Sequence, residues 1–118
     1  MRTREEALFC GLSFPDTYQD APFRGKNLQL VRYKGNKKAF LWVYEKDGHI
    51  NLNVKADPEK IFFWRDIYCS VIPAYHQNKE HWNTVILDGT IPEADIRVMI
   101  AEAMILYRTV RQREYMKP

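Results

Sequence analysis

The sequence has 118 residues, 46% hydrophobic and 28% charged, and a net charge of +3 from 18 basic and 15 acidic side chains. This length supports one domain with a single core, and the composition excludes a disordered or fibrous protein. No apolar run approaches the ~20 residues that span a bilayer, and the N-terminus lacks the apolar stretch of a signal peptide. We therefore expect one cytoplasmic domain over residues 1–118, with Cys10 and Cys69 reduced.

The chain opens with a predicted helix from about Arg2 to Gly11. Its pattern turns Ala7, Leu8 and Phe9 inward, and Gly11 is typical of a left-handed helix end. Residues 14–25 contain Pro-Asp and Ala-Pro breakers, so we expect this segment to be irregular.

Three strands are predicted next, at residues 28–33, 38–45 and 49–54. The dipeptide Asp47-Gly48 is typical of a two-residue hairpin turn, which places Lys46 opposite His49. This register puts aliphatic side chains on one face of the sheet and aromatic and amide side chains on the other. The aliphatic set is Leu41, Val43, Ile50, Leu52 and Val54, and the other set is Phe40, Trp42, Tyr44, Asn51, Asn53 and Lys55.

The rest of the chain is predicted to contain two helices and two short strands. Asp57-Pro58 is typical of a helix start, and the helix runs to about Tyr68 with Phe62 and Phe63 off its inward stripe. Short strands follow near residues 71–72 and 82–87. The last helix covers about residues 92–111 and is expected to bury Ile96, Met99, Ile100, Ala103, Leu106 or Tyr107, and Val110.

The predicted order is α-β-β-β-α-β-β-α. Tight hairpins exclude a parallel doubly wound sheet, because parallel neighbours need long crossover connections. The simplest arrangement that buries the aliphatic face is an α+β fold. It is a two-layer α/β sandwich in which a five-stranded antiparallel sheet carries its helices on one face.

Basic residues gather between positions 24 and 38, a window without Asp or Glu: Arg24, Lys26, Arg32, Lys34, Lys37 and Lys38. The net charge is too small to indicate a nucleic-acid binder by itself, so the distribution matters more. The cluster has two interpretations. It is either a solvated hairpin edge that lysines protect against edge-to-edge pairing, or a phosphate-binding patch.

Residues 73–85, Pro-Ala-Tyr-His-Gln-Asn-Lys-Glu-His-Trp-Asn-Thr-Val, concentrate polar groups more densely than any other stretch. Four interpretations are open. A metal site at His76 and His81 lacks a third ligand at a suitable spacing, and a Cys69–His76 nucleophilic pair lacks any sign of an oxyanion hole. A structural knot would tie the loop through backbone bonds from Tyr75, His76, Asn78 and Trp82. A recognition site would present Lys79, His81, Asn78 and Asn83 to a ligand.

Several motifs carry a resemblance to a known family. They are Asn36-Lys37-Lys38-Ala39-Phe40, Leu52-Asn53-Val54-Lys55-Ala56-Asp57-Pro58, Pro73-Ala74-Tyr75-His76, Asn78-Lys79-Glu80-His81-Trp82-Asn83-Thr84-Val85, Leu87-Asp88-Gly89 and Ile91-Pro92. With them the sequence resembles the MmcQ/YjbR-like family over about residues 14–110. It departs from the family pattern at Ala56, where many relatives carry Cys, and at Ala103-Met104, where many carry Ser-Tyr. The resemblance implies an antiparallel α/β sandwich similar to secretion chaperones, described as a double-wing DNA-binding fold.

We therefore expect a non-enzymatic binding module whose ligand is nucleic acid. Phosphates would meet Lys34, Lys37, Lys38, Lys55 and Lys79, with His81 and Asn83 as further contacts and Trp42, Tyr75, His76 and Trp82 as stacking or positioning groups. The alternative is a protein-interaction or chaperone-like domain that uses the aromatic sheet face. We expect no catalytic residues, metal, cofactor or membrane partner, and either a monomer or a homodimer.

Overall fold

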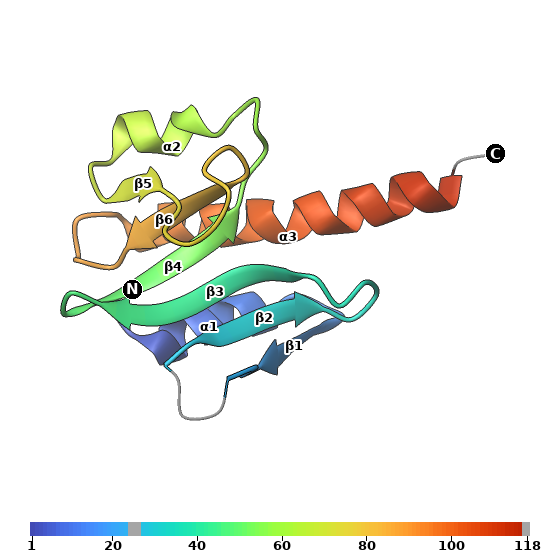
Figure 1. The fold of residues 1–118 in the computed structure, drawn as a ribbon, viewed down its shortest axis with the longest axis horizontal. Helices are drawn as coiled ribbons and strands as arrows, with labels where there is room; N and C mark the ends of the chain where they lie inside the picture. Colours follow the sequence, from blue (N-terminus) through green and yellow to red (C-terminus); the bar gives the residue numbers. More distant parts are fainter. Residues whose placement is uncertain (24–26, 117–118) are drawn as a thin grey trace.

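The structure is a computed structural model that describes the backbone of residues 1–23 and 27–116, and side chains up to residue 108. It contains three helices and six strands among these residues (Figure 1). In chain order they are α1 (Arg4–Leu12), β1 (Thr17–Asp20), β2 (Gln29–Tyr33), β3 (Ala39–Lys46), β4 (His49–Lys55), α2 (Phe62–Ile67), β5 (Val71–Pro73), β6 (Trp82–Ile86) and α3 (Glu93–Met116).

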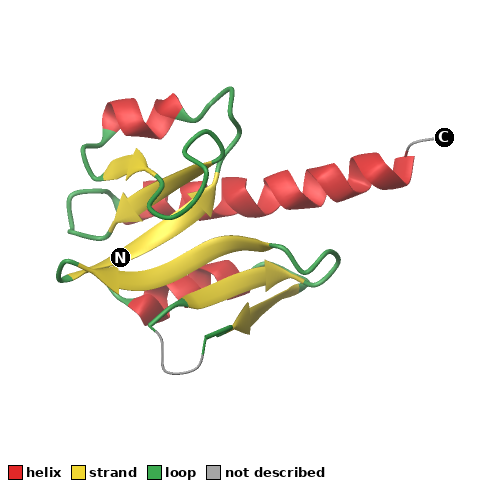
Figure 2. Cartoon of the chain, in the orientation of Figure 1, coloured by secondary structure: helices red, strands yellow, loops and turns green. Residues whose placement is uncertain are grey.

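The strands form one antiparallel sheet in the order β1-β2-β3-β4-β6-β5 (Figure 2). The prediction of five strands was wrong by one. The sixth strand, β1, lies in the segment predicted to be irregular and pairs with β2 over four residue pairs. A strand of four residues between proline breakers is too short to show an alternating pattern. Its pairing depends on a long-range contact with β2, where Arg32 also forms an ion pair with Asp20 at 2.8 Å.

The predicted hairpin register is confirmed. Asp47 and Gly48 both adopt positive φ, at 54° and 79°. Lys46 pairs with His49, and the aliphatic residues Val43 and Leu52 pair directly. The turn fixes this register because both residues can adopt the left-handed conformation that a two-residue hairpin requires.

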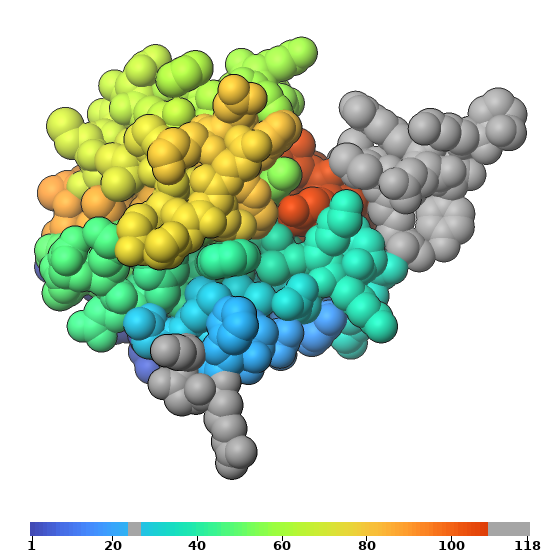
Figure 3. Space-filling model, in the orientation of Figure 1, coloured from blue at the N-terminus to red at the C-terminus, as the bar shows by residue number. Residues whose placement is uncertain are grey.

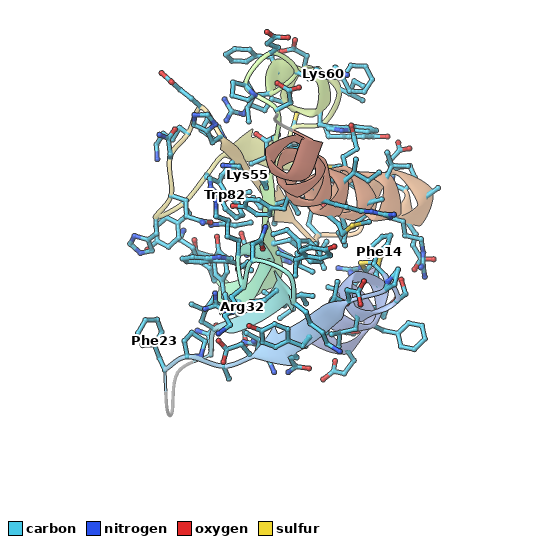
Figure 4. All side chains as sticks on the ribbon, turned by 90° about the vertical axis from the view of Figure 1, so that its right-hand side faces the viewer. Phe14, Phe23, Arg32, Lys55, Lys60 and Trp82 are labelled. Carbon is cyan, nitrogen blue, oxygen red and sulfur yellow. The ribbon has the colours of Figure 1, made fainter. Side chains whose placement is uncertain are left out.

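Helices α1 and α3 cover the aliphatic face of the sheet, whereas α2 lies beside β5 at the sheet edge (Figures 1 and 4). Helix α2 nevertheless lies on the same side of the sheet, as predicted, because Trp64 Nε1 donates to Glu102 of α3 at 2.9 Å and Arg65 Nε donates to Asn83 on the helical side at 2.6 Å. Helix α2 has six residues, none of them buried, and it begins at Phe62 rather than at Asp57. Asp57 stabilises a turn instead, since its side chain accepts from the Glu59 N–H at 2.9 Å and its carbonyl from the Lys60 N–H at 2.9 Å.

Helix α1 packs closely on the sheet through Gly11, which lies inside the helix rather than at a left-handed end. A Cβ at Gly11 would lie 2.9 Å from Leu41 Cδ2 and 3.1 Å from Val31 Cγ2. The expectation that Phe9 points inward was wrong, because that side chain is 74% exposed and Cys10 is buried instead. The absence of a Cβ thus sets the distance between α1 and the sheet.

The core lies between this helical layer and the sheet and includes most of the residues expected in α3: Ile96, Met99, Ile100 and Ala103. Val110, also expected there, falls outside the described side chains. Phe40, expected on the opposite face, is fully buried and belongs to the same core cluster. The pairing between β2 and β3 passes over Phe40, and such a bulge changes the direction of a side chain relative to the regular ladder.

Candidate functional site

The sheet face opposite α1 and α3, called here the open face, carries Trp42, Tyr44, Asn53, Lys55 and Trp82. Figure 4 shows Trp82 and Arg32 on the side of the sheet away from α1. Figure 3 looks onto this face, and the yellow segment between β5 and β6 lies across it. The polar motif of the sequence therefore folds over part of the aromatic sheet face. Strand β1 extends the sheet edge, and Phe23, which follows it, lies beside Trp42 and Tyr44 on the same face.

Asn53 anchors that loop. Its side chain is completely buried, and its Nδ2 donates to the Tyr75 carbonyl at 2.7 Å and to Gln77 Oε1 at 2.8 Å. Its Oδ1 accepts from the Tyr44 hydroxyl at 2.7 Å and from the Thr84 hydroxyl at 2.6 Å. Two donors and two acceptor positions are the full capacity of an amide, so Asn53 has no hydrogen-bonding position left for a ligand.

Further bonds within the loop agree with the structural interpretation of the motif. The Lys79 ammonium donates to the Ala74 carbonyl at 2.8 Å, and Asn78 Oδ1 accepts from the Glu80 N–H at 2.8 Å. The His81 N–H donates to the Asn78 carbonyl at 3.2 Å, and the His81 carbonyl accepts from Ala56. The Lys79 ammonium is therefore hydrogen-bonded within its own loop. The side chains of Tyr75 and His76 are exposed at the loop surface.

Asn83, predicted as a ligand contact, points to the helical side of the sheet and is only 1% exposed. Its Oδ1 accepts from Arg65 Nε at 2.6 Å, and its Nδ2 donates to the Ile61 carbonyl at 3.3 Å. Arg65 also donates to the carbonyls of Lys79 and Trp82. This amide therefore joins α2 to β6 and has no access to a ligand on the open face.

Four aromatic side chains form a row across the open face, called here the aromatic strip. In spatial order they are Trp82, Trp42, Tyr44 and Tyr75. The ring centroids of Trp42 and Trp82 lie 6.3 Å apart, and those of Tyr44 and Tyr75 lie 6.2 Å apart. The His76 ring lies 3.8 Å from the Tyr75 ring. A cavity of about 580 Å³, the aromatic cavity, opens among these rings and is lined by Phe23, Asn27, Leu28, Trp42, Tyr44, Glu45, Lys46, Asn53, Tyr75 and His76.

Two ammonium groups converge at the Trp82 end of the strip. Lys55 Nζ lies 5.4 Å from the centroid of the Trp82 ring and 5.7 Å from that of Tyr107, and Lys38 Nζ lies 5.6 Å from the same Tyr107 ring. Burial, followed by the nearby charge of Lys38, lowers the pKa of Lys55. Lys38 and Lys55 are called here the lysine pair. Within the part of the chain that the structure describes, no carboxylate forms an ion pair with either of them. A partly buried ammonium, Lys55, and an exposed one, Lys38, therefore lie beside the same Tyr107 ring, and an anion would complement their charge.

The structure thus brings together some of the predicted residues and separates others. Lys55, Trp42, Trp82, Tyr75 and His76 share the open face, and Lys38 approaches Lys55 at the Tyr107 ring of α3. Lys34 and Lys37 lie exposed in the turn before β3, and Arg24 and Lys26 fall outside the described residues. Sequence reasoning did not select Tyr44, Lys46 or Tyr107 as site residues. Lys46 Nζ lies 4.7 Å from the Tyr75 ring centroid and 2.8 Å from Asp47. The hairpin register could have indicated Tyr44, but no local pattern brings Tyr107 of α3 beside β4.

The structure also bears on metal binding and on membrane-spanning helices. Over the described residues, no cluster of three or more His, Cys, Asp and Glu side chains could hold a metal ion. None of the described helices is both long enough and apolar enough to cross a membrane.

Comparison with known proteins gives relatives of matching sequence. The chain is 37% identical over 71 residues to the uncharacterized protein YbdF of Escherichia coli O157:H7, covering 60% of this chain and 58% of YbdF. It is 34% identical over 61 residues to the uncharacterized protein YjbR of Escherichia coli K12, covering 52% of each. The matched part spans about half the length of these two relatives. The uncharacterized protein YyaQ of Bacillus subtilis is 32% identical over 117 residues, covering 90% of this chain and 98% of YyaQ.

Solved structures agree in fold. Protein DR2400 of Deinococcus radiodurans, with a DUF419 domain, superposes with a TM-score of 0.78 at 26% identity, covering 90% of this chain and 78% of that one. A Pseudomonas syringae protein gives a TM-score of 0.74 at 25% identity, covering 86% of this chain and 95% of that one. The YjbR family model matches residues 12–104. The chain therefore belongs to the YjbR family.

Proposed function

We propose that this protein is a non-enzymatic module that binds single-stranded nucleic acid across its open face. The lysine pair would meet phosphate groups, and the aromatic strip would stack on bases. The observation that carries the proposal is the position of the lysine pair at one end of the aromatic strip: Lys55 lies over the Trp82 ring, and Lys38 lies near Lys55 over the Tyr107 ring. Cationic groups next to a row of aromatic faces are the combination that single-strand binding requires.

Salt dependence tests the phosphate contacts. Each phosphate contact on a single strand contributes a log–log slope of about −0.7, so a Lys38→Gln/Lys55→Gln variant should bind a labelled thymidine oligomer with a slope weaker by about 1.4. Fluorescence anisotropy over a series of salt concentrations measures this slope.

The matched control removes the same charge elsewhere. Lys60 precedes α2, and Arg97 lies on α3 beside Glu93, so Lys60→Gln/Arg97→Gln lowers the net charge equally without touching the lysine pair. This variant should keep the wild-type slope to within about 0.5, since only displaced phosphate counterions contribute. Equal loss in both variants would mean that general charge attracts the ligand, and the lysine pair would lose its assigned role.

A protein-interaction domain is the second candidate, and a specific observation favours it. Phe62 and Phe63 are largely exposed beside a cavity of about 650 Å³ between α2 and α3. Exposed aromatic area of this kind often marks a protein contact. Association through apolar area should change little with salt or strengthen, whereas nucleic-acid binding must weaken.

A further inference from the structure

We propose that the aromatic cavity takes one unpaired base of the bound strand by stacking, without selecting among the bases. This inference rests on the proposed function and assigns the kind of group that the cavity accepts.

The walls of the cavity present ring faces. Tyr44 and Tyr75 are inclined by only 31° to each other, and Tyr75 is 41% exposed, so its ring is accessible from solvent. Trp42 forms a further wall and continues through Trp82 to the lysine pair. A volume of about 580 Å³ lies within the ~300–1,000 Å³ range of small-ligand pockets. One strand can therefore place a phosphate at the lysine pair and a base in the cavity.

The Tyr75–His76 wall is held in place before any ligand arrives. His76 has a φ of 65°, a conformation that a non-glycine residue adopts only where its surroundings enforce it. Asn53 Nδ2 bonds to the residues on both sides of His76, namely the Tyr75 carbonyl and Gln77 Oε1. Asn53 is thus a positioning residue, and a wall that is already rigid loses little conformational freedom when a base binds.

The polar group at the floor of the cavity cannot distinguish bases. Selection of a base requires free donors and acceptors that match its edge. All four hydrogen-bonding positions of Asn53 are occupied within the protein, and one of them accepts from the Tyr44 hydroxyl. None of the other polar residues that line the cavity, Asn27, Glu45, Lys46 and His76, is buried, so water competes for their hydrogen bonds. Stacking on ring faces is then the main contact, and every base offers a face.

The experiment compares oligomers of equal length and charge: thymidine, cytidine and adenosine oligomers, and one with abasic sites throughout. Their affinities for the wild-type protein are measured by fluorescence anisotropy at one low salt concentration. We expect the thymidine oligomer to bind on the order of tenfold more tightly than the abasic one, since base–aromatic stacking contributes about that much. Among the three bases, affinities should differ by less than about threefold.

Variants locate the effect. Tyr75→Ala should bind the thymidine oligomer several-fold more weakly than the wild type and leave the affinity for the abasic oligomer unchanged, and Tyr75→Phe should restore thymidine binding because it keeps the ring face. Phe62→Ala, an exposed aromatic away from the strip, should behave as wild type. The wild-type comparison of thymidine and abasic oligomers needs no variant, so a folding defect in Tyr75→Ala would not leave the proposal untested.

The outcomes separate the two claims. Equal, measurable binding of thymidine and abasic oligomers would overturn the base pocket and all stacking on the aromatic strip, and would leave only the phosphate contacts of the lysine pair, which the salt slope tests separately. Binding to none of the oligomers would overturn the proposed function itself. A preference above about threefold for one base would show that the cavity distinguishes base edges, which contradicts the absence of selection.

Discussion

At the scale of single residues, Asn53 joins the fold to the candidate site. It lies on β4, and its four hydrogen bonds tie together β3, β6 and the loop after β5. Buried amides stabilise only when every position is satisfied, since an orphaned buried donor or acceptor costs more than the bond contributes. In the sequence, nothing distinguishes Asn53 from the other polar residues. In the structure, its side chain is completely buried.

Replacing Asn53 by Ala should therefore lower the free energy of unfolding by about 3 kcal/mol, because several buried partners lose their bonds at once. Urea denaturation followed by circular dichroism measures the change. The matched control is Asn51→Ala, the same residue type on the same strand and face, where Nδ2 donates to the carbonyls of Lys46 and His49. That change should cost about 1 kcal/mol. Equal costs at the two positions would show that the four-bond network has no special weight.

At the scale of elements, the contact between α1 and the sheet depends on the missing side chain of Gly11. Replacing glycine inside a helix by alanine normally stabilises by ~0.5–1 kcal/mol, because alanine has the higher helix propensity. Here the added Cβ would press on Val31, a branched residue with little rotamer freedom, and on Leu41, which is completely buried.

We therefore expect Gly11→Ala to destabilise the protein by roughly 1–3 kcal/mol, the usual cost of overpacking a core. Thermal unfolding followed by circular dichroism is the measurement. Phe9→Ala on the same helix removes a largely exposed ring and should change stability by less than about 0.5 kcal/mol. A stabilised Gly11→Ala protein would mean that α1 can move away from the sheet without loss.

At the scale of the whole molecule, Asp88 links the end of the sheet to the start of α3. Burial raises the pKa of Asp88, but hydrogen bonds from the Ser70 and Thr90 hydroxyls and from the Thr90 N–H outweigh it, so the pKa falls from 3.8 to about 2. A carboxyl whose pKa is lower in the folded state stabilises fully above its unfolded pKa. That contribution disappears as the pH falls from about 4 to about 2.

The melting temperature of the wild-type protein should accordingly fall between pH 4 and pH 2, with Asp88 contributing about 1 kcal/mol because solvent screens these bonds. Asp88→Asn should be less stable at pH 7 and lose less stability over the acid range. Asp66→Asn removes the same charge from an exposed position on α2 and is the control. Parallel acid curves for wild type and Asp88→Asn would exclude this carboxylate as the cause.

Local chemistry in the sequence was sufficient for much of the architecture. Asp47-Gly48 fixes the hairpin register because its residues tolerate positive φ, and the alternation of β3 and β4 then assigns Trp42 and Tyr44 to one face and Leu41 and Val43 to the other. The short motifs between residues 36 and 92, with the polar motif as the strongest, likewise indicated the family, which the match over residues 12–104 shows. These inferences depend on neighbours in the chain or on short-range periodicity, which a sequence displays directly.

Long-range contacts decided the rest. Strand β1 exists only by pairing with β2. Asn83 alternates with Trp82 and Thr84 along β6 and therefore lies on the helical side, where Arg65 of α2, eighteen residues earlier in the chain, binds it. The lysine pair meets only where the end of β4, the turn before β3 and Tyr107 of α3 converge. The sequence by itself therefore determined the elements, the register of the hairpin and the family. Only the tertiary structure decided which polar groups are hydrogen-bonded within the protein and which stay accessible. Hydrogen bonds and the proximity of charges depend on distances between segments that are far apart in the chain.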